Sequence, residues 1–207
     1  MEPLIETRYM NMLDLRYRQT GHYYSATRRA PEDTVALKQD ADFKDMIADA
    51  ANCMVIVLCA DGEPRMLLTK EFRYPVGQYL LSPPAGLIDS RDMSEPDPVL
   101  SAAVREIREE TGLEIGEGDR VFKVNPLCFS TPGMTDESNA FLCAEITVED
   151  TAEVTQDGCV GTELFAGFEL VDVAAAEKLY ATGRDRYGNF FSLATWVVLG
   201  YFIANYR

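Results

Sequence analysis

Three glutamates at helical spacing are the residues of this chain whose types and positions could carry out chemistry. Glu106, Glu109 and Glu110 occupy positions i, i+3 and i+4, which lie on one face of an α-helix about one turn apart. Like charges at that spacing repel each other. A hard divalent cation such as Mg²⁺ or Mn²⁺ would offset the repulsion, because these ions prefer carboxylate oxygens. The three glutamates by themselves favour the simpler alternative, a solvated acidic surface.

The residues around the glutamates predict the helix that positions them. Asp97-Pro98 is a suitable N-cap and first-turn pair, and Gly112 suits the position just after the last turn. Apolar residues recur at i, i+3, i+4 and i+7 of this helix: Leu100, Ala103, Val104 and Ile107. Such a stripe faces a core. We expect the flanking carboxylates at the edge of that core, where a cleft could form.

The segment from Gly86 to Leu113 resembles the Nudix box. Its second half, Arg105-Glu106-Ile107-Arg108-Glu109-Glu110-Thr111-Gly112-Leu113, matches every fixed position of that motif. The first half departs twice, because eighteen residues separate Gly86 from Arg105 where the motif has thirteen, and Asp97 stands for the first glutamate. The extra residues, 90–96, are polar and rich in turn formers, so we expect them to bulge out before the helix. Asp97 is fully explained as a helix cap.

Further stretches are similar to the ADP-ribose pyrophosphatase group of the Nudix superfamily. They are the strand-like Lys70–Gly77, the loop Pro84–Asp89 and the loop Thr131–Glu137. The hairpin that ends near Arg28 is similar to the group's dimer-forming N-terminal sheet. Two features depart from the group: Ser82 replaces a usual glutamate, and Asp33–Ala48 looks like an insertion. Both bear on the choice of substrate more than on the reaction class.

The resemblance implies a metal site on the predicted helix. Glu106 and Glu110 would ligate Mg²⁺ (or Mn²⁺) directly, Glu109 would ligate the ion or order bound water, and the backbone carbonyl of Ala85 would complete the site. The metal would neutralise a diphosphate and lower the pKa of the attacking water. Arg105 is expected to be an ion-pair partner of a box glutamate.

The resemblance also implies a set of substrate-binding residues. They are Arg73, Arg28, Tyr23, Gly133 and Glu137. Arg73 would hold phosphate through a forked contact, and a surface salt bridge is an equal alternative for it. Tyr23 or its neighbour Tyr24 would stack on adenine, although a tyrosine in a hairpin often only covers a sheet.

A loop carboxylate acts as the catalytic base in relatives of this group. Glu163, just before the apolar residues 164–166, best matches its place, and Asp157 and Glu153 are alternatives. For any single one of these residues, a solvated acidic loop is the simpler interpretation.

The bulk properties narrow the class of protein. The 207 residues fit one globular domain with a small appendage, and a net charge of -15 argues against a nucleic-acid partner. The five cysteines include no C-x-x-C pair, and no signal peptide is evident, so we expect reduced thiols in a cytoplasmic protein. The apolar run Phe190–Ala204 is too short to span a bilayer, and we expect a buried helix there and no membrane partner.

Periodicity predicts an α+β protein. We expect a hairpin over Met12–Arg29, strands over residues 53–60, 65–72, 79–83, 121–129, 139–146 and 164–171, and helices after Asp97 and Asp172 and at the C-terminus. The resemblance implies the Nudix fold, with mixed β-sheets between helices. Residues 1–50 would form the N-terminal hairpin and dimerisation region with its insertion, and residues 51–207 the hydrolase domain.

Together these features predict a Mg²⁺-dependent hydrolase of a nucleoside diphosphate sugar, with ADP-ribose split into AMP and ribose 5-phosphate. One alternative is another sugar nucleotide with the same chemistry. A second alternative is a nucleotide-sensing module without turnover, against which the intact glutamates argue. We expect a homodimer.

Overall fold

The computed structural model describes residues 1–149, 154–158 and 164–207. The chain forms two compact units. The first contains residues 1–49 and 126–139, and the second contains residues 50–125 and 140–207. The predicted loop bases Glu163 and Glu153 lie outside the described residues.

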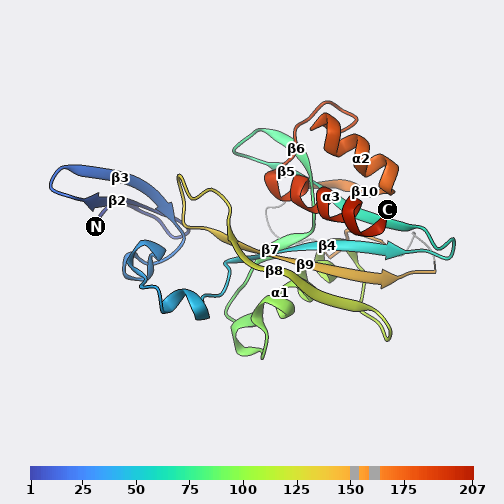
Figure 1. Cartoon of the computed structure of the whole chain (residues 1–207), viewed down its shortest axis with the longest axis horizontal. Helices are drawn as coiled ribbons and strands as arrows, with labels where there is room; N and C mark the ends of the chain where they lie inside the picture. Colours follow the sequence, from blue (N-terminus) through green and yellow to red (C-terminus); the bar gives the residue numbers. More distant parts are fainter. Residues whose placement is uncertain (150–153, 159–163) are drawn as a thin grey trace. The chain divides into compact units, whose positions relative to one another are not determined.

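An antiparallel sheet of order β1-β2-β3 begins the first unit. Its strands are β1 (Glu2–Glu6), β2 (Asn11–Tyr17) and β3 (Gly21–Thr27), drawn in blue in Figure 1. The predicted hairpin is confirmed, and Arg18 takes a left-handed φ of 58° at its turn. Strand β1 was not predicted, because its five residues are exposed and include Pro3, a residue confined to sheet edges.

The segment after β3 contains three short 3₁₀ helices: Pro31–Asp33, Val35–Leu37 and Asp42–Asp45. Around Phe43 the chain thus forms only a single 3₁₀ turn. The segment follows Arg29 and ends just before Asp49. The guanidinium of Arg29 and the carboxylate of Asp49 form an ion pair at 2.6 Å.

A seven-stranded sheet of order β10-β5-β4-β9-β8 organises the second unit, with β6 beside β5 and β7 beside β4. The strands are β4 (Ala50–Leu58), β5 (Pro64–Arg73), β6 (Gln78–Ser82), β7 (Ala85–Leu87), β8 (Arg120–Phe129), β9 (Ser138–Thr147) and β10 (Phe165–Val171). Every strand expected from the sequence is present. The predicted buried strand is β4, which is apolar on both faces and buried along nearly its whole length.

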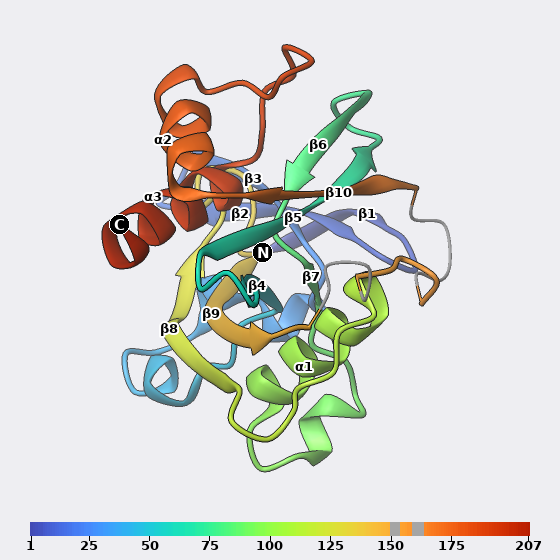
Figure 2. The same cartoon turned by 90° about the vertical axis from the view of Figure 1, so that its right-hand side faces the viewer.

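Helices cover both faces of this sheet. Helix α1 (Pro98–Thr111) packs on β4 and β7, whereas α2 (Val173–Thr182) and α3 (Leu193–Tyr206) pack together on the opposite side (Figures 1 and 2). Asp172 caps α2 as predicted, because its carboxylate accepts the N–H of Ala175 at 2.7 Å. The expected α+β architecture, with a sheet between helices, is confirmed.

The expectation of a fully buried C-terminal helix is wrong for one side of α3. Val198, Leu199 and Phe202 are buried, but Leu193 is 64% exposed and Trp196 is 43% exposed. Trp196 stacks on the ring of Tyr180 with centroids 4.5 Å apart, at the surface and not in the core. Among the described helices, none is both long and apolar enough to cross a bilayer.

Candidate active site

Both predicted ends of the box helix are formed. Asp97 accepts the N–H of Leu100 at 3.2 Å, and Gly112 takes a left-handed φ of 71° while donating to the carbonyl of Arg108. Burial acts to raise the pKa of Asp97, but a hydrogen bond from Lys123 lowers it below its ordinary value. Asp97 is therefore an ionised cap, as the sequence indicated.

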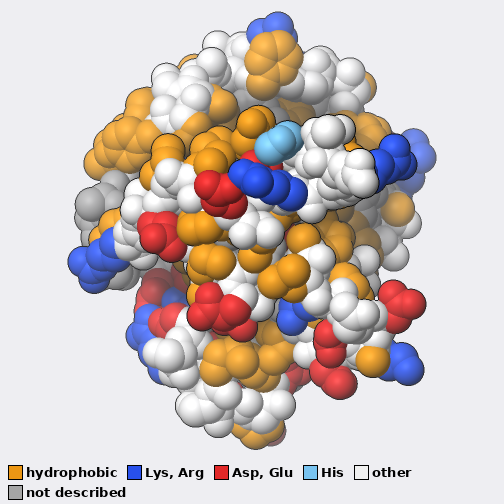
Figure 3. Space-filling model, turned by 90° about the vertical axis from the view of Figure 1, so that its left-hand side faces the viewer, with side chains coloured by type: hydrophobic (Ala, Val, Ile, Leu, Met, Phe, Trp, Pro, Cys, Tyr) orange, Lys and Arg blue, Asp and Glu red, His pale blue; other side chains and the backbone are white. Residues whose placement is uncertain are grey.

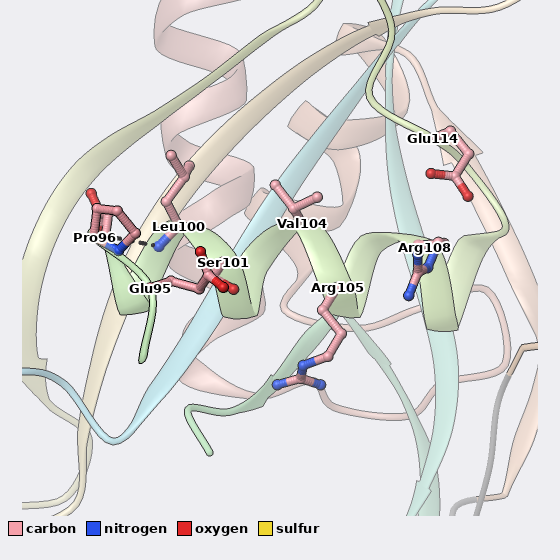
Figure 4. A pocket seen from close by; sticks show the side chains of 9 residues that line it. Glu95, Pro96, Leu100, Ser101, Val104, Arg105, Arg108 and Glu114 are labelled. Carbon is pink, nitrogen blue, oxygen red and sulfur yellow. Dashed lines mark hydrogen bonds between the residues drawn. The ribbon is translucent and has the colours of Figure 1, made fainter. Parts of the chain in front are cut away.

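The buried face of α1 differs from the predicted stripe. Its buried residues are Val99, Ala102, Ala103, Ile107, Glu110 and Thr111. Leu100, Val104 and Arg105 all line one open pocket. Leu100 and Val104 are half-buried, and in Figure 4 they point to the side of the helix opposite to Arg105. The core-facing stripe is thus rotated away from Leu100 and Val104. As a result Glu110 lies on the buried face and does not merely flank it.

Glu110 is held against the sheet by two hydrogen-bond donors. One carboxylate oxygen accepts the backbone N–H of Ala85 at 3.1 Å, and the other accepts the hydroxyl of Thr69 at 3.4 Å. The residue is only 5% exposed. Burying a carboxylate costs free energy unless its lone pairs are bonded, and these two donors from β7 and β5 meet that need. Of the metal-site residues expected from the sequence, Ala85 and Glu110 are therefore in direct contact.

Glu106 lies against the backbone of Gly86. A Cβ atom built on Gly86 would come within 1.8 Å of a carboxylate oxygen of Glu106. A larger residue at this position would have to displace the carboxylate of Glu106, which pairs with Arg105. The same contact brings β7 to the face of α1 that carries Glu106.

Arg105 links the acidic residues of the site. Its guanidinium pairs with Glu106 and lies 3.4 Å from Glu109, and it donates to the carbonyl of Leu87 at 3.0 Å. Burial acts against its charge, but the hydrogen bond to Asp92 and the charge of Glu106 raise the pKa of Arg105 above its ordinary value. The predicted ion pair between Arg105 and a box glutamate is confirmed.

Asp92 is a member of this network that the sequence did not reveal. It lies in the 90–96 insertion, is buried, and pairs with Arg105 at 2.9 Å. It also accepts the N–H of Asp89 and the hydroxyl of Ser101. Burial acts to raise the pKa of Asp92, but the hydrogen bond from Arg105 lowers it. The insertion therefore supplies a carboxylate that orients Arg105, a role that no motif spacing indicated.

The residues present fit a hard divalent cation by their chemistry. Glu106, Glu109 and Glu110 all supply carboxylate oxygens from one helix. Burial, followed by the charges of Glu110 and Glu106, raises the pKa of nearby Cys53 well above its ordinary value. Within the described ranges, no three acidic, histidine or cysteine side chains already converge on one point. Glu106 and Glu109 face Arg105, and metal binding would exchange that guanidinium for the ion.

The first unit brings together four of the residues predicted to bind substrate. The hydroxyl of Tyr23 donates to the carbonyl of Gly133 at 2.7 Å, and Arg28 pairs with Glu137 at 2.9 Å. Tyr24 points to the opposite face of the sheet, because successive side chains of a strand alternate. The geometry therefore distinguishes the two tyrosines, and Tyr23 is the one that reaches the loop.

Arg73 and Asp157 lie in the second unit. Arg73 pairs with the buried carboxylate of Glu71 at 2.6 Å, so the salt bridge considered from the sequence is present. Asp157 is exposed in a loop that packs on the end of α1: Thr155 donates to the carbonyl of Thr111 at 2.8 Å. A Cβ on Gly158 would lie 2.6 Å from the carbonyl oxygen of Glu109. This loop acid is thus close to the box helix.

Comparison with known proteins identifies the family of the chain. The family model of the NUDIX domain matches residues 50–193. An uncharacterized Nudix hydrolase of Schizosaccharomyces pombe is 34% identical over 72% of this chain and 68% of its own length. An ADP-ribose pyrophosphatase of Saccharomyces cerevisiae is 32% identical over 52% of this chain and 45% of its own length. An ADP-sugar pyrophosphatase of Mus musculus is 31% identical over 54% of this chain and 47% of its own length.

A box helix with three carboxylates, a glycine packed on one of them and a sheet between helices define a Nudix hydrolase domain. The chain belongs to the Nudix family, whose model covers most of its length. It spans about half the length of the two named pyrophosphatases that it matches.

Proposed function

We propose that this protein hydrolyses the diphosphate bond of a nucleoside diphosphate sugar with Mg²⁺, and that ADP-ribose is split into AMP and ribose 5-phosphate. The observation that carries the proposal is the acidic face of α1, where Glu106 and Glu110 meet the loop of Gly86 and Glu109 lies 3.4 Å from Arg105. Relatives named ADP-ribose pyrophosphatase and ADP-sugar pyrophosphatase support the choice of substrate.

The metal, bound by Glu106, Glu110, Glu109 and the carbonyl of Ala85, would neutralise the diphosphate and lower the pKa of the attacking water. Glu110 is positioned for this by the N–H of Ala85, which fixes one of its oxygens. Arg105, which pairs with Glu106 and lies near Glu109, would give up these contacts to the metal and keep its bond to Asp92. Mn²⁺ fits the same donors as Mg²⁺.

The substrate-binding set comprises Arg73, Arg28, Tyr23, Gly133 and Glu137. Arg28 and Arg73 each bind one carboxylate. Because a guanidinium has five N–H donors, each arginine has further N–H groups that could donate to a phosphate oxygen. Glu163 is proposed as the base that accepts a proton from water, with Asp157 or Glu153 in that role if Glu163 is dispensable.

A homodimer is part of the proposal. Met12, Ile5 and Tyr24 lie on one face of the β1–β3 sheet and are all more than a third exposed. Figure 3 views the side where this sheet is drawn in Figure 1 and shows hydrophobic side chains gathered on that surface. Such a surface marks an interface, and a second copy is the usual partner in closed assemblies. A cytoplasmic location is proposed from the free thiols.

A substrate panel tests the proposal. ADP-ribose, other nucleoside diphosphate sugars and dinucleoside polyphosphates would be incubated with the protein in Mg²⁺, and products identified by chromatography. We expect AMP and ribose 5-phosphate from ADP-ribose and no turnover in EDTA. A preference for a different sugar nucleotide would establish the alternative substrate. Tight binding without turnover of any compound would establish the sensing module.

A further inference from the structure

Residues 30–48, called the excursion below, form a surface segment whose two ends lie close together. None of these residues has a role in the proposed function. The three 3₁₀ turns of the excursion lie between Arg29 and Asp49, whose side chains form an ion pair at 2.6 Å. Connections of this length between two elements are uncommon in compact proteins, and those that occur are frequently functional. The contacts of the excursion within the first unit indicate what it does.

The excursion reaches the predicted substrate loop, residues 131–137, through one carboxylate. Asp136 accepts the backbone N–H of Val35, at the start of a 3₁₀ turn, at 3.1 Å. The same oxygen of Asp136 lies 3.6 Å from the guanidinium of Arg29. That distance is too long for a hydrogen bond but still attractive between opposite charges.

Two neighbouring arginines face two neighbouring acids at this point. The outer pair, Arg28 and Glu137, has side chains that are 50% and 35% exposed. The inner pair, Arg29 and Asp136, has side chains that are 20% and 12% exposed. An exposed pair exchanges easily with solvent and ligand, whereas a buried charge needs fixed partners. The inner pair is therefore suited to fixing the loop, and the outer pair to meeting a ligand.

A second tie holds the loop just beyond Glu137. Asp49 accepts both the N–H and the hydroxyl of Ser138 at 2.8 Å, and its own N–H donates to the carbonyl of Ser138 at 3.0 Å. The excursion thus binds Asp136, the residue before Glu137, through Val35. Asp49, which follows the excursion, binds Ser138, the residue after Glu137.

We propose that the 30–48 excursion is a positioning element for the 131–137 loop, and that it acts through Asp136. The proposal rests on the proposed function, in which Gly133 and Glu137 contact the substrate. Asp136 would touch neither the substrate nor the metal. It orients the loop by accepting from Val35 and facing Arg29, so its loss should weaken substrate binding and leave the chemical step intact.

Kinetics of three variants test the proposal. Asp136→Ala removes the acceptor, and Val35→Pro removes the N–H donor while leaving the acceptor in place. Proline suits this position because Thr34 before it is extended with ψ 138° and a 3₁₀ turn begins there. Asp45→Ala removes an exposed carboxylate from the same excursion and is the matched control. We expect KM for ADP-ribose to rise about tenfold in the first two variants, with kcat within about twofold, and neither constant to change in the control.

The double variant and a conservative variant sharpen the result. Asp136→Ala combined with Val35→Pro should be no worse than Asp136→Ala alone, because both remove one hydrogen bond. Asp136→Asn keeps an oxygen acceptor for Val35 and should recover most of the binding. Equal loss of kcat in the single variants, or additive effects in the double variant, would overturn the proposal.

Amide hydrogen exchange gives a readout that does not need activity. The N–H of Thr135 donates to the carbonyl of Thr131 within the loop, and its exchange should accelerate in Asp136→Ala and Val35→Pro but not in Asp45→Ala. If exchange is faster in these variants but the protein does not hydrolyse ADP-ribose, the positioning role stands and only the proposed substrate is rejected. Unchanged exchange in both variants would reject the positioning role itself.

Discussion

The box helix and the 131–137 loop carry the two halves of the proposed chemistry, and they are built in opposite ways. The carboxylates of α1 are placed by their spacing in one helix, and their bonds to β5 and β7 join residues at most 41 positions apart. The loop is placed by residues 101 to 110 positions away, in β3 and the excursion. The helical repeat itself positions the carboxylates of α1, whereas contacts with the N-terminal segment hold the loop in its conformation.

This difference predicts which property a substitution in each region should change. A helix positions side chains by its repeat, so a substitution in the box removes one group and leaves the others in place. A loop with proline and glycine has no repeat of its own, and its conformation depends on every partner that holds it. Variants of the box should therefore affect chemistry, and variants of the N-terminal segment should affect binding.

The largest expected effect comes from the box. Glu106→Gln and Glu110→Gln should each lower kcat by about a thousandfold or more, because each removes a metal ligand, while circular dichroism remains unchanged. Isothermal titration with Mg²⁺ should show weaker metal binding in both. Glu114→Gln, an exposed carboxylate just after the helix, is the control. Full activity of both variants, or turnover of the wild type in EDTA, would contradict a metal site here.

The next effect concerns the loop base. Glu163→Gln should lower kcat by roughly two orders of magnitude with little change in KM, as expected for a group used only in the chemical step. Single-turnover kinetics would measure it. A normal kcat in Glu163→Gln together with a loss in Asp157→Asn would transfer the role to the loop that packs on the end of α1.

A smaller effect should follow from opening the proposed dimer. Met12→Arg places a charge on the exposed face of the N-terminal sheet and should shift sedimentation from dimer to monomer, because burying an unpaired charge opposes association. If the dimer completes the substrate pocket, KM should rise about tenfold while metal binding stays normal. Arg18→Lys in the hairpin turn keeps the charge and serves as control. A wild-type protein that is monomeric and active would exclude the dimer.

The smallest effect is on stability and concerns Asp92. Asp92→Asn should lower the free energy of unfolding by about 1 kcal/mol, because Arg105 loses one buried charged partner but keeps Glu106 and Glu109 beside it. The pKa of Asp92 is lowered in the folded protein from an ordinary value of 3.8. Its stabilisation is therefore present above pH 3.8 and is lost as the pH falls through the lower folded value. Urea unfolding from pH 6 to pH 3 should show a shallower decline in the variant.

Several elements could be predicted because their signals are local. The Asp97 cap and the Gly112 terminus define α1 from a few neighbouring residues, and a long apolar run defines β4. The face of α1 that meets the core was less predictable. Leu100 and Val104 are as apolar as Val99 and Ile107, so periodicity alone could not choose between two overlapping stripes, and packing against β4 and β7 decided between them.

The sequence by itself determined the chemistry of the box, since the type and spacing of Glu106, Glu109 and Glu110 place three carboxylates on one helix face. Tertiary structure alone decided which groups hold them and which groups hold the 131–137 loop. Asp92 reaches Arg105 from an insertion, and Asp136 meets Val35 across 101 residues. The physical reason is that a helix repeats every few residues and leaves a pattern in the chain. Contacts between distant segments form only on folding and leave no such pattern.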